Sequence, residues 1–134
     1  MAHKILIVED EVSLSEAYHM LLKQAKYDVV VAQDGRDALN KVDDFDPELI
    51  LLDLRMPVLD GVGFLKEYDL INKHPNVKVI VFSNYDMQDE IDEAYRLGAD
   101  RYILKAWASP REILNLVHDA LETKDDKTSP TGRH

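Results

Sequence analysis

The chain has 134 residues, enough for one domain with a sizeable core. Its 16 lysines and arginines against 26 aspartates and glutamates give a formal net charge of −10, which argues against direct binding of nucleic acid through phosphate contacts. The absence of cysteine excludes a disulfide framework, thiolate catalysis and a cysteine zinc site. No apolar run has the length of a signal peptide or a membrane span, so we expect a cytoplasmic protein that does not bind membranes.

Five short apolar runs predict β-strands that are buried on both faces. Each is rich in Val, Ile and Leu, too short for a helix and too continuous for a strand with one exposed face. The stretches between them are long enough for one helix each. The predicted strands are residues 4–8, 28–32, 49–53, 78–82 and 101–104.

Between these runs, apolar residues recur with the spacing of a helix. Residues with a side-chain oxygen precede each helical stretch and predict where it begins. Two of them, both serines, are followed three residues later by a glutamate, which is the pattern of a capping box. The helix that follows residues 28–32 is expected to be the shortest. The predicted caps are Ser13, Asp34, Asp60, Asp86 and Ser109.

The regular alternation of strand and helix defines the expected fold class. Parallel strands joined by right-handed crossovers place helices on both faces of a sheet, so we predict a doubly wound α/β fold with a five-stranded parallel sheet. This domain is expected to span residues 1–122. Residues 123–134 are polar and lack apolar periodicity, and they predict a tail or a truncated linker.

Charged and polar side chains stand where four of the five strands end. Glu9 and Asp10 follow the first strand, Asp53 ends the third, and Ser83 and Lys105 follow the fourth and fifth. In such folds the carboxyl ends of the strands form one rim, so we expect these groups to converge. Three crowded carboxylates repel one another unless a hard divalent cation neutralises them, and oxygen ligands favour Mg²⁺ over zinc.

A carboxylate beside a bound cation can act as a nucleophile towards phosphorus. Asp53 is the strongest candidate, because the preceding apolar run, residues 49–52, fixes it in the centre of the sheet. Lys105 would then pair with the phosphoryl group, and the carboxylates of Glu9 and Asp10 would bind the metal.

From about Lys4 to Leu121, the sequence resembles the receiver domain of two-component response regulators, of the chemotaxis-regulator type and with a flavodoxin-like fold. Each mark is weak alone, but together they are highly specific. They are Glu9-Asp10, Leu52-Asp53-Leu54-Arg55-Met56-Pro57, Asp60-Gly61, Ser83 and Lys105.

The resemblance implies that Asp53 accepts a phosphoryl group from a histidine kinase, a histidine phosphotransfer protein or a small phosphodonor. Mg²⁺ would be held by Asp10, Asp53 and the backbone carbonyl of Arg55 and, through water, by Glu9. The chain would thus be a signalling receiver and not an enzyme, with intrinsic Mg²⁺-dependent phosphotransfer and autodephosphorylation.

The resemblance also implies a switch. Ser83 and Lys105 would bind the phosphoryl oxygens, and the ring of Tyr102 would turn inward when Ser83 moves towards the phosphate. The face formed by the helix after Asp86, the strand 101–104 and the helix after Ser109 would then bind an output partner of unknown identity or a second copy of the chain.

The sequence departs from the family pattern near this site. Ala106 stands where the family has proline, so we predict a trans bond after Lys105, because a non-proline cis bond costs about 2.5–4 kcal/mol. Trp107 is either an exposed anchor for a partner or, as we favour, a cover for the core. Asn84 is expected to narrow access to Asp53. Arg55 and Tyr85 either tune the phosphoryl lifetime or are simple rim residues.

Other functions remain open. The departures at Ala106 and Asn84 motivate a constitutive, phosphorylation-independent binding module on the same fold. A flavodoxin-like electron carrier is disfavoured because the carboxylates of residues 9–11 would repel its phosphate. An aspartate-based phosphohydrolase is disfavoured because Arg55 stands where a second acid is needed.

Overall fold

The computed structural model describes residues 2–84 and 87–122, which form a parallel five-stranded sheet in the order β2-β1-β3-β4-β5. The predicted fold class is confirmed, and the strands agree with the prediction except that the fourth is one residue longer. The strands are β1 Lys4–Val8, β2 Asp28–Ala32, β3 Leu49–Asp53, β4 Lys78–Ser83 and β5 Arg101–Leu104. The helices are α1 Val12–Gln24, α2 Gly35–Phe45, α3 Gly61–Tyr68, α4 Leu70–Lys73, α5 Gln88–Arg96 and α6 Pro110–Glu122, and a 3-10 turn, η1, spans Lys105–Trp107.

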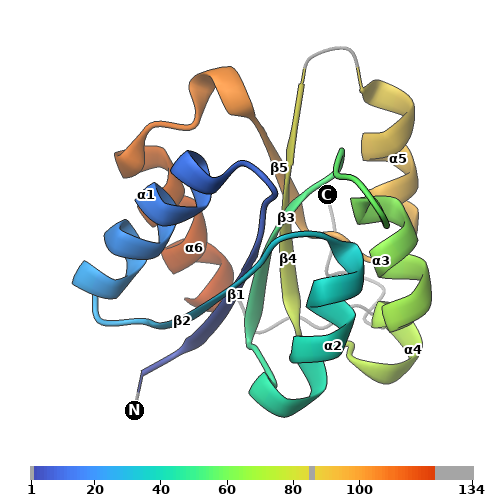
Figure 1. The fold of residues 1–134 in the computed structure, drawn as a ribbon, viewed down its shortest axis with the longest axis horizontal. Helices are drawn as coiled ribbons and strands as arrows, with labels where there is room; N and C mark the ends of the chain where they lie inside the picture. The colour runs from blue at the N-terminus through green and yellow to red at the C-terminus, as the bar shows by residue number, and fades with distance from the viewer. Residues whose placement is uncertain (1, 85–86, 123–134) are drawn as a thin grey trace.

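The helices cover the sheet on both faces, with α1 and α6 on one side and α2 to α5 on the other (Figure 1). Successive residues of a strand point to opposite faces. In β1, Leu6 and Val8 therefore enter the core beneath α2 and α3, whereas Ile5 and Ile7 enter the core beneath α1 and α6. Burial on both faces explains why these strands are continuous apolar runs.

The strand order reverses between β1 and β3. The chain passes from β1 outward to β2 and then returns to β3 on the other side of β1, so the connections that follow β1 and β3 lead to opposite faces. In open α/β sheets, sites form at such a reversal. Asp53 ends β3 at this point, with every residue of β3 buried.

Three of the predicted helix caps are confirmed. The side chains of Asp34 and Asp60 each accept a hydrogen bond at 2.8 Å from the backbone N–H three residues later. The Ser109 hydroxyl accepts one from the N–H of Glu112 at 3.2 Å. Asp86 lies outside the described residues.

The prediction for Ser13 is wrong, because the N-cap position is occupied two residues earlier by Glu11, without a side-chain cap, and α1 begins at Val12. The carboxylate of Glu9 instead accepts the N–H of Glu11 at 3.0 Å. This contact turns the chain immediately after β1, so the helix starts before Ser13 is reached.

The expectation that the helix after β2 is the shortest is also wrong. That helix, α2, has 11 residues, whereas α3 has 8 and is separated from the 4-residue α4 by Asp69. Asp69 has φ 55° and ψ 55°, the left-handed conformation that interrupts a helix.

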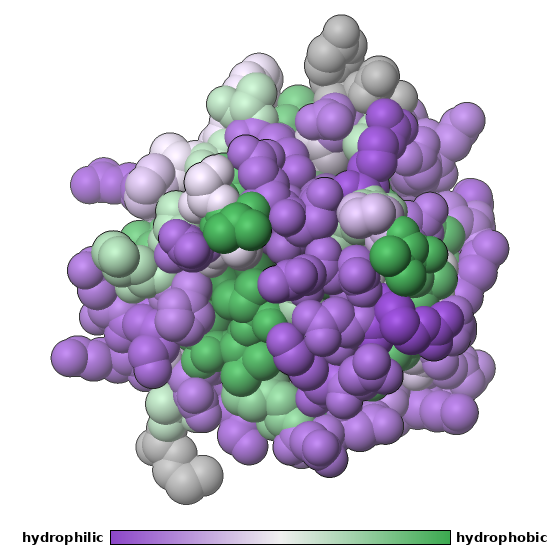
Figure 2. Space-filling view, in the orientation of Figure 1, coloured by the Kyte–Doolittle hydropathy of each residue, from purple (hydrophilic) through white to green (hydrophobic). Residues whose placement is uncertain are grey.

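The surface seen in Figure 2 is mostly hydrophilic, as the net charge requires, with an apolar patch at the level of β2. Next to it, a groove of about 570 Å³ runs along α1 as far as Glu9. At the edge strand β2, the ammonium of Lys41 in α2 donates to the carbonyl of Val31 at 2.8 Å. Among the described residues, no helix is long and apolar enough to cross a membrane. The predicted tail at 123–134 lies outside the described residues.

Candidate functional site

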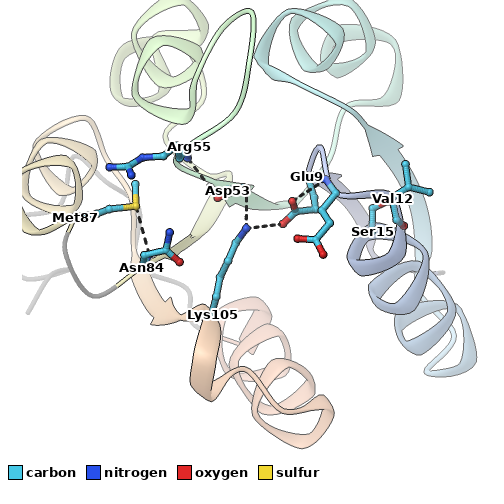
Figure 3. A network of polar contacts seen from close by, with 9 residues as sticks. Glu9, Val12, Ser15, Asp53, Arg55, Asn84, Met87 and Lys105 are labelled. Carbon is cyan, nitrogen blue, oxygen red and sulfur yellow. Dashed lines mark hydrogen bonds and ion pairs between the residues drawn. The ribbon is translucent and has the colours of Figure 1, made fainter.

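Asp53 is the centre of the candidate site. Only 2% of the residue is exposed, and its carboxylate accepts hydrogen bonds from Lys105 Nζ at 2.9 Å and from the backbone N–H of Arg55 at 3.3 Å. Figure 3 shows Lys105 reaching from the end of β5 towards Asp53 and Glu9. The structure therefore brings together three of the side chains that the sequence placed at strand ends.

Glu9 is buried as deeply as Asp53. One carboxylate oxygen accepts the N–H of Glu11, whereas the other lies 3.3 Å from Lys105 Nζ and has no well-formed hydrogen bond among the described residues. Burial, reinforced by the charge of Asp53, raises the pKa of Glu9 to about 7 despite the opposing effects of the Glu11 N–H and of Lys105. Two buried carboxylates thus share one lysine, and the surroundings disfavour the charged form of Glu9.

Lys105 keeps its charge in this setting. Burial alone would lower the pKa of its ammonium, but the hydrogen bond and the charge of Asp53, together with those of Glu9, raise the pKa above its usual value. The side chain is 23% exposed and lines a cavity together with Ser83 and Asn84, so it is partly accessible from outside.

Three carboxylates meet here with a geometry suited to a cation. Oxygen atoms of Glu9, Asp10 and Asp53 lie within 4.8 Å of one another, and Asp10 is exposed. A hard cation with several water ligands fits such a partly open oxygen cluster. Lys105 supplies one positive charge for the three carboxylates, so a divalent cation would complete the neutralisation.

Ser83 lies at the end of β4, and 1% of the residue is exposed. Its hydroxyl oxygen is buried and has no hydrogen-bond partner among the described residues. A cavity of about 280 Å³ adjoins it, lined also by Asn84 and Lys105. Buried hydroxyls are nearly always paired, so this one is available for a group that arrives from outside.

Tyr102 and Trp107 both face outward. Tyr102 is 43% exposed on β5, and its ring meets the ring of Tyr95 of α5 edge-on at 6.2 Å between centroids. Trp107 is 73% exposed, so the expectation that it covers the core is wrong. Trp107 ends the 3-10 turn Lys105–Trp107 and belongs to neither core, and residues of α6 cover the core on this face of the sheet instead.

Lys105 contacts Asp53 although Ala106 stands where the family has proline. The described residues contain no cis peptide bond, which confirms the trans bond predicted after Lys105. The lysine nevertheless lies 2.9 Å from Asp53. Asn84 is exposed beside the site (Figure 3), while Tyr85 lies outside the described residues.

Two contacts at the site were not predicted from the sequence, although it drew attention to the residues Gly61 and Arg55. Gly61 lies so close to β3 that a Cβ atom would stand 2.7 Å from the carbonyl oxygen of Asp53, and its place after Asp60 was the signal. The guanidinium of Arg55 lies 3.3 Å from the carboxylate of Glu90 in α5. No local pattern indicates this ion pair, because its partners are 35 residues apart.

Comparison with known proteins gives the same class as the fold and the site. The family model described as the response regulator receiver domain matches residues 5–118. The chain therefore belongs to the response regulator receiver domain family. It is a receiver domain of two-component signal transduction, and thus part of a signalling protein.

Curated relatives agree with this assignment. The chain is 36% identical over 127 residues to a protein of Porphyridium aerugineum described as "Probable transcriptional regulator ycf27", covering 94% of this chain and 51% of the relative. A protein of the same description from Cyanophora paradoxa is 34% identical over 129 residues, with 96% and 52% covered. The chain spans about half the length of these relatives.

Solved structures share the fold. A CheY-like response regulator receiver domain protein from Methanospirillum hungatei superposes with a TM-score of 0.85 at 25% identity, covering 92% of this chain and 97% of the other. A response regulator signal receiver domain from Bermanella marisrubri gives a TM-score of 0.80 at 32% identity, with 91% and 100% covered.

Proposed function

We propose that Asp53 is the phosphoryl acceptor of this receiver. The observation that carries the proposal is the placement of its buried carboxylate, hydrogen-bonded to Lys105 at 2.9 Å and clustered with the carboxylates of Glu9 and Asp10. A nucleophilic carboxylate needs a fixed position and nearby charges that stabilise the transferred oxygens, and this arrangement supplies both.

The proposed cofactor is Mg²⁺. Asp10, Asp53 and the backbone carbonyl of Arg55 would hold it directly, and Glu9 would do so through water. The excess of negative charge at the three clustered carboxylates supports this assignment. Bound Mg²⁺ would neutralise charge on the phosphoryl oxygens.

In the proposed reaction, a carboxylate oxygen of Asp53 forms a bond to phosphorus. The phosphorus–nitrogen bond of a phosphohistidine, or the phosphorus–oxygen bond of acetyl phosphate, breaks at the same time, and its electron pair leaves with the imidazole or the acetate. The ammonium of Lys105 lies where it can exchange its contact with Asp53 for the new phosphoryl oxygens. Autodephosphorylation is hydrolysis of the resulting acyl phosphate.

We propose further that Ser83 and Tyr102 form the switch. The unpartnered buried hydroxyl of Ser83 would bind a phosphoryl oxygen, and the outward ring of Tyr102 would then turn towards the space that Ser83 leaves. The face formed by α5, β5 and α6 would change with it and bind a second copy of the chain or an output partner. The description of the relatives as transcriptional regulators supports an output in the control of transcription. The cytoplasmic location stays a prediction.

The alternative function is a constitutive binding module that has kept the fold without phosphotransfer. Its motives were the departures from the family pattern at Ala106 and Asn84. Lys105 still contacts Asp53, so the departure at Ala106 no longer favours this alternative. The distinction between the two functions is whether Asp53 takes up phosphate.

Intact-protein mass spectrometry after incubation with Mg²⁺ and acetyl phosphate tests the acceptor. The wild type should gain one phosphoryl mass, and the gain should disappear in Asp53→Asn and when the metal is chelated. Asp44→Asn is the matched control, because Asp44 is an exposed aspartate of α2 and its loss should leave labelling unchanged.

Rapid hydrolysis can hide a working acceptor, so beryllofluoride, a stable mimic of the phosphoryl group, is titrated in parallel. Labelling that survives Asp53→Asn would refute the assignment of the acceptor. Absence of both labelling and Mg²⁺-dependent beryllofluoride binding in the wild type would favour the constitutive module.

A further inference from the structure

The ion pair between Arg55 and Glu90 joins the acceptor loop to α5. Arg55 lies two residues after Asp53, and its backbone N–H donates to the Asp53 carboxylate at 3.3 Å. Its guanidinium Nη2 donates to Glu90 Oε2, also at 3.3 Å, and Glu90 lies in the first turn of α5. Figure 3 shows the Arg55 side chain directed away from Asp53.

This ion pair is exposed and held by one hydrogen bond. The side chain of Arg55 is 59% exposed and that of Glu90 is 40% exposed. The pair between Arg36 and Glu67, in contrast, has two hydrogen bonds of 3.2 Å. Exposed pairs with a single contact contribute little to stability, so a more strongly charged anion close to Arg55 will compete with Glu90.

A phosphoryl group on Asp53 is such an anion. The phosphoryl group carries about 1.5–2 negative charges where the carboxylate carried one, and it adds three strong acceptor oxygens at a site two residues from Arg55. The planar guanidinium can bind two of those oxygens at once, which a single contact with Glu90 does not match.

We propose that Glu90 is a positioning residue that holds Arg55 away from the acceptor, and that phosphorylation of Asp53 transfers the guanidinium from Glu90 to the phosphoryl oxygens. The inference rests on the proposed function of Asp53. The exchange removes the link between the acceptor loop and α5, and it places a side chain over the phosphoryl group.

The exchange sets the lifetime of the phosphoryl group. In hydrolysis, water attacks phosphorus, the bond between phosphorus and the Asp53 oxygen breaks, its electron pair returns to the carboxylate, and the water's proton is released with inorganic phosphate. A guanidinium bound over the phosphoryl oxygens obstructs the approach of that water. Loss of the competing charge at Glu90 therefore lengthens the lifetime.

A double-mutant cycle measures this coupling. Wild type, Glu90→Gln, Arg55→Ala and the double variant are labelled with Mg²⁺ and acetyl phosphate, the donor is removed, and the decay of the phosphoryl mass is followed. Glu90→Gln should lengthen the half-life about twofold to fivefold, the range expected for one exposed ion pair. Arg55→Ala should shorten it, and Glu90→Gln should then have no effect in that background.

Two further measurements separate the exchange from a structural effect. Glu93→Gln removes the same charge from the same helix, where Glu93 pairs with Arg96, and its half-life should equal that of the wild type. At about 1 M salt, where charges are screened within about 3 Å, the effect of Glu90→Gln should shrink.

The outcomes distinguish the inference from the function on which it rests. If Glu90→Gln decays like the wild type, or lengthens the half-life equally without Arg55, the exchange is wrong while labelling of Asp53 still stands. If the wild type takes up neither phosphate nor beryllofluoride, the function of Asp53 is wrong and the inference falls with it.

Discussion

At the scale of single residues, Glu9 carries the largest electrostatic cost of the site. Its carboxylate is buried beside Asp53, and one of its oxygens relies on the 3.3 Å contact with Lys105. A group that binds Mg²⁺ must be available as an anion, and the surroundings of Glu9 favour its protonated form. A cation bound at the site would therefore lower this electrostatic cost by stabilising the charged form of Glu9.

This cost predicts how stability changes with pH when no metal is present. In the folded protein the pKa of Glu9 is raised from its ordinary value of 4.5 to about 7, so the folded protein binds the proton more tightly than the unfolded chain. The bound proton of Glu9 contributes fully to the free energy of unfolding below pH 4.5, and this contribution is lost as the pH rises through 7. Urea unfolding in chelator should give a larger loss of free energy between pH 5 and pH 8 in the wild type than in Glu9→Gln.

Glu16→Gln is the control for this measurement, because Glu16 is an exposed glutamate of α1 and its variant should keep the pH dependence of the wild type. Saturating Mg²⁺ should reduce the dependence in the wild type, since a cation stabilises the charged form of Glu9. A pH dependence that is identical in wild type and Glu9→Gln would contradict the assignment of this cost to Glu9.

At the scale of secondary-structure elements, two serines with the same sequence pattern have different roles. Ser109 caps α6 by accepting the N–H of Glu112 at 3.2 Å, and Pro110 occupies the first helical position. Ser13 has the same glutamate three residues later but lies inside α1, which begins at Val12.

The two serines therefore predict different costs for the same substitution. Ser109→Ala should lower the free energy of unfolding by about 1 kcal/mol, because it removes the cap of α6. Ser13→Ala should change it by about 0.5 kcal/mol or less, because alanine suits a helix interior. Urea denaturation of both variants at one pH tests this, and equal losses would show that the assigned start of α1 is wrong.

The sequence predicts the strands and the converging side chains of the site, but not the start of α1 or the ion pair between Arg55 and Glu90. The strands were predictable because burial on both faces leaves a continuous apolar run such as residues 49–52. The convergence of Glu9, Asp53 and Lys105 followed from the rule that parallel strands end at one rim. The start of α1 and the pair between Arg55 and Glu90 were not predictable, because each depends on how far a side chain reaches in three dimensions.

At the scale of the whole molecule, the site is connected to a distant surface through the sheet. Ser83 and Tyr102 lie on the adjacent strands β4 and β5, and the ring of Tyr102 contacts Tyr95 of α5. In the register of these strands Tyr102 lies opposite Val81, two residues before Ser83, so in the proposed switch a movement of Ser83 would act on a neighbouring part of the face formed by α5, β5 and α6. The proposed switch needs no larger rearrangement than this, provided that phosphate binds one of the two arrangements better.

This connection predicts a change in assembly. Sedimentation velocity with Mg²⁺ and beryllofluoride should show self-association that the untreated protein lacks at the same concentration, and Tyr102→Ala should weaken it. Met20→Ala is the control, because Met20 is an exposed apolar residue of α1, on the opposite face of the sheet from α5. Identical sedimentation and partner affinity in both states would exclude this face as the switched surface.

The distribution of the site over the strands has one more consequence. β1 leads into Glu9 and Asp10, β3 ends in Asp53, β4 in Ser83, and Lys105 follows β5. Each strand is separated from the next in the chain by a helix, so no continuous fragment shorter than most of the domain holds the full set. A chain still emerging from the ribosome, or one cut before β5, has an aspartate but no lysine to pair with it. If Asp53 and Lys105 act as proposed, competence to receive a phosphoryl group would therefore arrive only with completion of the fold.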